Sequence, residues 1–190
     1  DRIGMNELQY TPISLVACNL YPFVSAATKD PPLDEDALLE MIDIGGPTMV
    51  RASAKNHANV IICCNPKDYD SIIEDLVKSK GDPSGVPLGR RQNLALVAYQ
   101  HTASYDVAIA NALHKRWKNV PESFDDIDEQ SKRFHDTLLA SSIKMETLRY
   151  GENAHQSAAL FVDDEALGNH STLVTAQVEG GKAMSYNNYS

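Results

Sequence analysis

The sequence predicts an α/β fold, and three observations lead to this class. Two short apolar runs, ISLVAC (13–18) and VIICC (60–64), are typical of buried strands. The second run is followed by a stretch of helical periodicity over 66–81, and a strand followed by a helix is the signature of an α/β fold. With 43% hydrophobic and 23% charged residues, the 190-residue chain can bury a substantial core. We therefore expect a globular protein.

The first apolar run ends in Asn-Leu-Tyr-Pro, so the expected strand opens into a loop at Asn19. In an open parallel sheet, ligands bind outside the C-terminal ends of the strands. The loop that carries Asn19 and Tyr21 is therefore a candidate edge of a binding site.

Two helices are expected between the strands. Segment 33–42 has apolar residues at helical spacing and acidic residues in its first turn. After Gly45-Gly46, Pro47 suits the first position of a second helix that continues through 48–56. A Gly-Gly pair lets the backbone approach a ligand closely and offers amide groups at the helix start.

Two further helical patterns follow the second apolar run. The helix over 66–81 ends at Gly81, which suits a C-cap. Segment 88–117 is one long helix or two abutting helices. Its candidate core positions are Leu94, Ala95, Val97, Ala98, Tyr105, Val107, Ala108, Ala110 and Leu113.

An acidic segment poor in apolar residues, 119–131, is the best candidate for a connector between domains. Strand-like stretches follow at 145–150 and 158–162, separated by Gly, Asn and Asp. We expect a domain boundary near the acidic segment.

Charge and cysteine usage exclude several classes of protein. The formal net charge of -9 argues against a surface that coats nucleic acid. The three cysteines, Cys18, Cys63 and Cys64, lie in apolar runs without disulfide or zinc spacing, which indicates a reduced, cytoplasmic setting. No apolar run is long enough to predict a membrane span. No metal site is expected, because the histidines lack ligand spacing.

Five segments resemble, in order and spacing, the bifunctional family of purine biosynthesis that combines AICAR transformylase with IMP cyclohydrolase. They are NLYPF (19–23), IDIGGPTMVRASAKNH (42–57), RRQNLALVAYQHTASYD (90–106), LRYGENAHQSAAL (148–160) and GKAMSYNN (181–188).

The resemblance implies two incomplete domains. Residues 1–140 would be the C-terminal part of a cyclohydrolase domain with a methylglyoxal-synthase-like parallel sheet, together with the connector. Residues 141–190 would be the first strands of a second, cytidine-deaminase-like α/β domain, the transformylase. The chain would then be a fragment that lacks the N-terminal part of the first domain and most of the second, and alone it would be inactive.

The family's activities supply the expected function. The transformylase formylates AICAR to FAICAR with 10-formyltetrahydrofolate as cosubstrate, and the cyclohydrolase closes FAICAR to IMP with loss of water. By resemblance the catalytic residues are Lys55, Asp43 and Tyr21, and the nucleotide base contacts Cys18, Asn19, Asp43, Ile44 and Gly45, whereas Arg149 and Tyr150 match substrate contacts of the transformylase. The family also implies a cytoplasmic homodimer that binds nucleotides, with no metal and no resident cofactor.

The chemistry of ring closure gives these residue types a reason. The carboxamide nitrogen attacks the formyl carbon, so negative charge builds on the formyl oxygen and a proton must leave the nitrogen. Lys55 and Tyr21 suit the stabilisation of that oxygen, and Asp43 can orient or accept the amide proton.

Two alternatives of other classes stay open. The chain could be a non-catalytic ligand-binding module on the same fold, or a truncated fragment whose role is dimer contact. One departure from the family pattern is Ala154, which stands where the family has Pro beside the Arg149-Tyr150 pair.

Overall fold

The computed structural model describes residues 2–117, 140–163, 180–181 and 183–189. It divides into two compact units, Asp1–Ile109 and Ala110–Ser190, which are described separately. The acidic segment 119–131, expected to be a connector, lies outside the described residues. The domain boundary expected after residue 140 therefore stays a prediction.

The first unit is built around two parallel strands, β1 (Leu15–Ala17) and β2 (Ile61–Cys63), in the register Leu15 to Ile61. Both expected strands are present, and each is shorter than its apolar run. All three residues of β2 are buried, whereas β1 is only partly covered. The Cys18 amide extends the pairing by donating to the Cys63 carbonyl at 2.9 Å, so the chain leaves the sheet at Asn19.

Short helices precede and follow the first strand: α1 (Arg2–Glu7), α2 (Phe23–Ala27) and α3 (Glu35–Leu39). The next helix, α4 (Gly45–Lys55), begins earlier than expected, so Pro47 is its third residue rather than its first. Proline is tolerated there because the first four N–H groups of a helix have no intrahelical acceptor. As a result, the Gly-Gly pair forms the first turn of α4.

The segment after β2 forms a 3₁₀ turn, η1 (Pro66–Asp68), then α5 (Tyr69–Lys78) and a second 3₁₀ turn, η2 (Pro83–Gly85). The end of α5 is a Schellman motif: the Gly81 amide donates to Leu76 O at 2.7 Å, and the Lys80 amide to Val77 O at 3.1 Å. Gly81 belongs to this cap, as expected. The left-handed C′ position, however, is occupied by Lys80, with φ of 56°.

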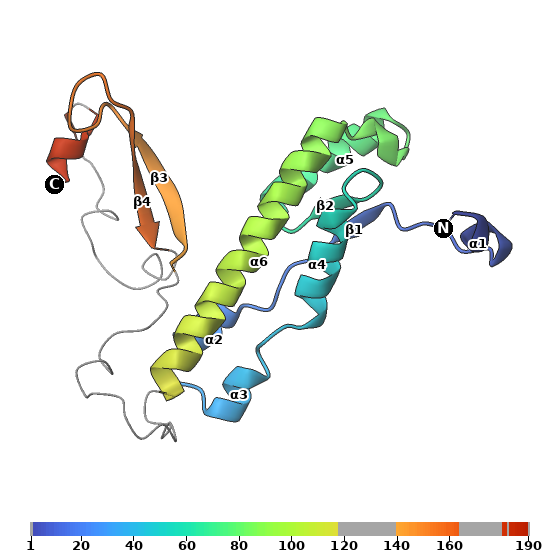
Figure 1. Cartoon of the computed structure of the whole chain (residues 1–190), viewed down its shortest axis with the longest axis horizontal. Coiled ribbons are helices and arrows are strands. Elements are labelled where there is room, and N and C mark those ends of the chain that lie inside the picture. Colours follow the sequence, from blue (N-terminus) through green and yellow to red (C-terminus); the bar gives the residue numbers. More distant parts are fainter. Residues whose placement is uncertain (1, 118–139, 164–179, 182, 190) are drawn as a thin grey trace, which may run out of the picture. The chain divides into compact units, whose positions relative to one another are not determined.

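The long pattern is one helix, α6 (Leu88–Trp117), which runs diagonally through the view beside α4 and the strands (Figure 1). Of its expected core residues, Leu94, Ala95, Ala98 and Tyr105 are buried, and Thr102 joins them. Val97, Val107, Ala108, Ala110 and Leu113 are half-buried. The core of the unit combines Val50, Ala54, Ile61, Ile62, Cys63, Cys64, Ile72, Val86, Leu94, Ala95 and Ala98.

The second unit contains an antiparallel pair, β3 (Ser142–Leu148) and β4 (Ala158–Asp163), with an irregularity between Lys144 and Glu146. A 3₁₀ turn, η5 (Tyr186–Asn188), follows. The two expected strands of this part are thus confirmed. The chain is a mixed α/β protein with a small parallel sheet and a separate antiparallel pair, and no described helix is long and apolar enough to cross a membrane.

Candidate functional site

Asp43 lies directly before the first turn of α4, and its carboxylate is packed against that turn. Its Oδ1 accepts a hydrogen bond of 2.8 Å from the Gly46 amide. A Cβ placed on Gly46 would lie 2.3 Å from Asp43 Oδ2 and 2.8 Å from a methyl carbon of Leu20. The partial positive charge at the start of a helix attracts the oxygen atoms of a side chain placed there. Glycine at position 46 therefore lets the carboxylate occupy the helix start.

The backbone around Asp43 is held by a tyrosine of α6. The Asp43 amide donates to Tyr105 Oη at 2.8 Å, and the Tyr105 hydroxyl donates to the Met41 carbonyl at 3.2 Å. Burial raises the pKa of Tyr105, the Asp43 amide opposes that rise, and the nearby Asp43 and Asp106 carboxylates and Tyr21 add to it. The hydroxyl is therefore protonated at neutral pH and can donate.

The loop after β1 brings further expected residues to this end of the sheet. Burial, and then the charge of Asp43, raise the pKa of the Cys18 thiol, so Cys18 lies within electrostatic range of the carboxylate. Asn19 Oδ1 accepts a hydrogen bond of 3.1 Å from the Tyr69 hydroxyl. Tyr21 is 54% exposed and so has a face open to a ligand.

Ile44 and Gly45 complete the group at the start of α4. Ile44 is exposed, and nothing lies within 4 Å of the position that a Cβ on Gly45 would take. The structure therefore gathers all the expected base-contact residues, Cys18, Asn19, Asp43, Ile44 and Gly45, together with Tyr21, at the C-terminal end of β1 and the N-terminus of α4. This group is called the β1–α4 site below.

Lys55 is not part of the β1–α4 site. It is the last residue of α4 and is exposed, whereas Asp43 precedes the first residue of the same helix. Ten helical steps from Gly45 to Lys55 correspond to a rise of about 15 Å. Within one chain, therefore, Lys55 and Asp43 stand at opposite ends of α4.

Arg149 and Tyr150 form a compact pair in the second unit. The Arg149 Cζ lies 4.8 Å from the centre of the Tyr150 ring, and Arg149 Nη2 donates to Tyr150 Oη at 3.2 Å. A hydrogen bond with Ser185, followed by the Arg149 contacts, lowers the pKa of Tyr150. Backbone bonds from Arg149 to Met184 and from Tyr186 to Tyr150 hold the two segments together. Both expected residues thus lie beside the GKAMSYNN segment.

The loop that carries Ala154 is closed by its own hydrogen bonds. The Gly151 amide donates to Gln156 O at 2.8 Å, and the Asn153 amide donates to Gln156 Oε1 at 2.9 Å. Ala154 itself is exposed. The loop beside Arg149 therefore has a defined shape without a proline at position 154.

Sequence reasoning did not single out Tyr105 or Ser185 as site residues. Tyr105 was expected only in the core, yet a buried tyrosine hydroxyl needs a hydrogen-bond partner, and that requirement was the available signal. Ser185 is 2% exposed and lies in a segment that matched the family, but nothing in its local pattern distinguishes it from a turn residue.

Among the described residues, no group of three or more His, Cys, Asp or Glu side chains is placed to hold a metal ion. Cys63 and Cys64 are buried in the core, as their apolar run predicts, whereas Cys18 is half-buried. Arg90, in the first turn of α6, forms an ion pair with Asp75 and donates a hydrogen bond to Ser71 O. These contacts give Arg90 a structural role.

Comparison with known proteins gives two findings. The model of the AICARFT/IMPCHase bienzyme family matches residues 53–190, a range that contains Lys55, Arg149 and Tyr150 and begins after Asp43. A solved structure described as the crystal structure of ForH is similar, with a TM-score of 0.52 and 35% sequence identity. That match covers 59% of this chain and 56% of the ForH chain, so the chain corresponds to little more than half of that relative.

Proposed function

This chain belongs to the AICARFT/IMPCHase bienzyme family, and on that basis we propose that its first unit contributes the site at which FAICAR is closed to IMP. The observation that carries the proposal is the β1–α4 site. It combines a carboxylate, an exposed phenol and an open helix start at the C-terminal end of a parallel strand, where α/β sheets bind ligands.

In this proposal Asp43 binds the carboxamide of the substrate. Its Oδ1 is engaged by the Gly46 amide, and Oδ2 is the oxygen that receives or orients the amide proton. Because Oδ1 is fixed by the backbone, the carboxylate is already oriented before the substrate arrives. The carboxamide and the formyl group that react belong to one molecule, so catalysis consists largely of holding them in position. A carboxylate that is already oriented therefore lowers the activation barrier of ring closure.

Tyr21 supplies the hydroxyl that stabilises the formyl oxygen as negative charge develops. Its exposed face in the loop after β1 suits contact with a ligand bound above the strand end. Cys18, Asn19, Ile44 and Gly45 surround the base in the same proposal. The Tyr69 hydroxyl fixes the Asn19 side-chain oxygen, which leaves the Asn19 amide nitrogen as the donor for the ligand.

Lys55 belongs to the proposal by family resemblance, with a role separate from that of Asp43. About 15 Å of helix rise separates the two ends of α4, so one chain cannot place both side chains on the same ligand atom. Lys55 therefore acts on another group of the nucleotide, or on a nucleotide held by the second chain of a homodimer.

For the second unit, we propose that Arg149 and Tyr150 contact AICAR during formyl transfer from 10-formyltetrahydrofolate. At the end of β3, Arg149 is exposed and Tyr150 is half-buried, and the segment around Ser185 holds both residues in place. A guanidinium suits an anionic nucleotide because it presents several fixed donors.

A second candidate function is a nucleotide-binding module without turnover. The separation of Lys55 from Asp43 favours it, because binding of the base needs only the β1–α4 site, whereas catalysis in the expected form needs the lysine as well. A dimer-contact fragment would bind no nucleotide at all.

The test uses the full-length enzyme that carries this chain, supplied with FAICAR, with IMP formation followed by absorbance. Asp43→Asn and Lys55→Ala are compared with Lys78→Ala. Lys78 is a matched control because it is also an exposed lysine at the last position of a helix, and it makes only a surface pair of 3.7 Å with Glu74. We expect losses of at least about hundredfold in kcat for Asp43→Asn and no change for Lys78→Ala.

The outcomes separate the candidates. No IMP from the wild-type enzyme overturns the cyclohydrolase proposal, and a nucleotide titration then distinguishes the binding module, which binds, from the contact fragment, which does not. A wild-type rate in Lys55→Ala keeps the reaction and removes that residue from it. Sedimentation of the same protein tests the proposed homodimer.

A further inference from the structure

Tyr105 connects the two segments that build the β1–α4 site, although it lies on a helix more than sixty residues further along the chain. Its hydroxyl contacts the backbone at Met41 and Asp43, at sequence separations of 64 and 62 residues. Its ring packs edge to face on Phe23, with ring centres 6.1 Å apart and an interplanar angle of 73°. Phe23 belongs to the segment that also carries Tyr21.

We propose that Tyr105 is a positioning residue of the cyclohydrolase site, whose hydroxyl fixes the backbone that presents the Asp43 carboxylate. This inference rests on the proposed function of Asp43 and extends it to a residue that touches no substrate. It assigns to α6 a part in catalysis beyond its contribution to the core.

The backbone at Asp43 needs such a support. Residues 41–43 lie between α3 and α4, outside both helices. The Met41 and Ile42 amides bond back to α3, whereas the Asp43 amide bonds to Tyr105. Because the hydroxyl donates to one peptide and accepts from the other, a single side chain fixes two peptide groups of this short connection.

The hydroxyl and the ring have separable roles. Tyr105 is 7% exposed, and its ring packs against Phe23, a contact that phenylalanine would preserve. The hydroxyl makes the contacts with the loop. Removing it leaves the Asp43 amide and the Met41 carbonyl without this partner, and partly buried polar groups without partners destabilise the local structure.

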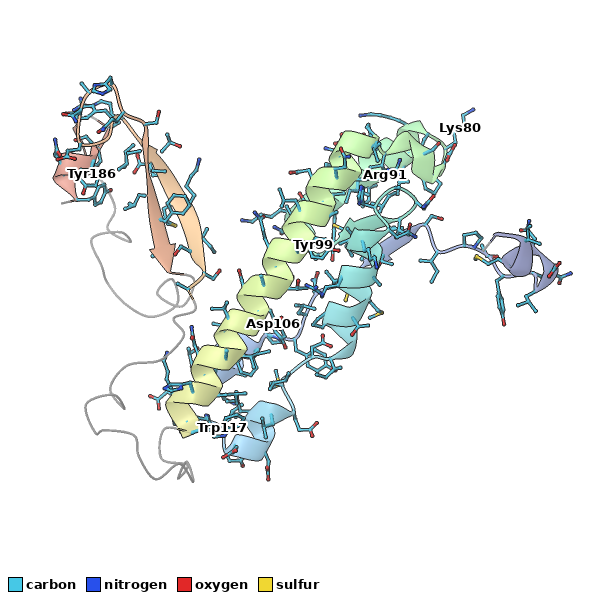
Figure 2. The ribbon with its side chains drawn as sticks, viewed as in Figure 1. Lys80, Arg91, Tyr99, Asp106, Trp117 and Tyr186 are labelled. Carbon is cyan, nitrogen blue, oxygen red and sulfur yellow. The ribbon has the colours of Figure 1, made fainter. Side chains whose placement is uncertain are left out.

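The decisive variant is Tyr105→Phe in the full-length enzyme, with Tyr99→Phe as its matched control. Tyr99 lies on the same helix (Figure 2), and Arg51 Cζ lies 5.4 Å from the centre of its ring. Phenylalanine can make the same contact. We expect Tyr105→Phe to lower kcat about tenfold with KM changed by less than about twofold, because the binding groups remain and the carboxylate is displaced. Tyr99→Phe should leave both constants at the wild-type values.

A second readout separates positioning from general stability. In a double-mutant cycle with Asp43→Asn, Tyr105→Phe should cause no further loss of kcat, because the carboxylate that Tyr105 positions has already been removed. Equal losses in both backgrounds would mean that Tyr105 supports the fold without acting through Asp43, and would overturn the proposal.

Amide hydrogen exchange tests the same inference without any assay of activity. The Asp43 amide should exchange faster in Tyr105→Phe than in the wild type, and at the wild-type rate in Tyr99→Phe. Unchanged exchange in Tyr105→Phe overturns the inference, even if the enzyme makes IMP. Faster exchange supports the positioning even if the wild-type enzyme makes no IMP, in which case only the proposed reaction fails.

If Tyr105→Phe does not fold, the wild-type protein still decides the matter. The Asp43 amide should then be protected relative to the amide of Gly45, the exposed first residue of α4. Equal exchange at the two positions would contradict the proposed hydrogen bond.

Discussion

The amide of Gly46 and the carboxylate of Asp43 are in direct contact: the hydrogen bond is 2.8 Å long, and no space remains between the two residues for a methyl group. The neighbouring Gly45 has open space around it. Two adjacent glycines in one motif therefore have different reasons to be glycine. Gly45 leaves open space at the start of α4, and Gly46 leaves room for the Asp43 carboxylate.

Gly46→Ala is expected to displace Asp43 and lower kcat/KM at least about hundredfold, because the new Cβ would lie 2.3 Å from Asp43 Oδ2. Overpacking should also lower the free energy of unfolding by about 1–3 kcal/mol. Activity and thermal unfolding of the full-length enzyme measure both effects. Gly45→Ala is the control and should retain stability, so equal destabilisation by the two variants would contradict this explanation.

Lys80→Gly is expected to stabilise the first unit by about 1 kcal/mol, because a side chain at a left-handed C′ position carries a steric cost that glycine avoids. Figure 2 marks Lys80 at the turn after α5, where its φ is 56°. Denaturant unfolding measures the change. Lys78→Gly, two residues earlier at the last position of α5, should instead destabilise the unit by up to about 1 kcal/mol. A loss of stability in Lys80→Gly would contradict the assigned cap.

The sequence predicted the elements better than their ends. Strands and long helices followed from apolar runs and periodicity, because burial determines both. The helix ends differ from the predicted ends because more than one residue can occupy each end position. Pro47 is acceptable anywhere in the first turn of α4, and Lys80 rather than Gly81 takes the C′ position after α5. Such choices depend on a few tenths of a kcal/mol to about 1 kcal/mol, which periodicity does not resolve.

The candidate site was predicted in part for a physical reason. Residues that follow a parallel strand lie at one edge of the sheet, so Asn19 and Tyr21 could be assigned to a candidate site from the strand pattern, whereas Asp43 was assigned by family resemblance. The motif that carries Asp43 also carries Lys55, yet a helix separates the ends of that motif by about 15 Å. Tyr105 was not singled out because its hydrogen bonds join segments that lie far apart in the sequence.

Arg149→Met and Ser185→Ala are each expected to raise the pKa of Tyr150. The hydrogen bond between Tyr150 and Ser185, and then the Arg149 contacts, favour the ionised form of the phenol, which lowers its pKa from the ordinary value of 10.0. Ultraviolet titration of the tyrosines measures the change against Tyr186→Phe, which should leave this titration in place. Because the folded pKa is the lower one, this contribution to stability is complete above pH 10 and is lost as the pH falls through the folded pKa. A contribution from ionisation of Tyr150 that persisted unchanged down to pH 7 would contradict the assignment.

Cys64 should be the least reactive of the three thiols, and its ionisation should limit stability in alkali. Burial is the main reason that its pKa rises from 9.0 to about 11, so at pH 8 the folded protein holds about a hundredfold less Cys64 thiolate than an unfolded chain. Site-resolved alkylation should therefore modify the half-buried Cys18 before Cys64.

Because the folded pKa of Cys64 is the higher one, its stabilising effect is complete below pH 9 and declines by up to about 1.4 kcal/mol per pH unit between pH 9 and 11. Cys64→Ala should lose this part of the alkaline decline while keeping any decline due to other groups. An identical pH dependence of unfolding in the wild type and Cys64→Ala would show that the Cys64 thiol titrates alike in the folded and unfolded protein, and would contradict the raised pKa.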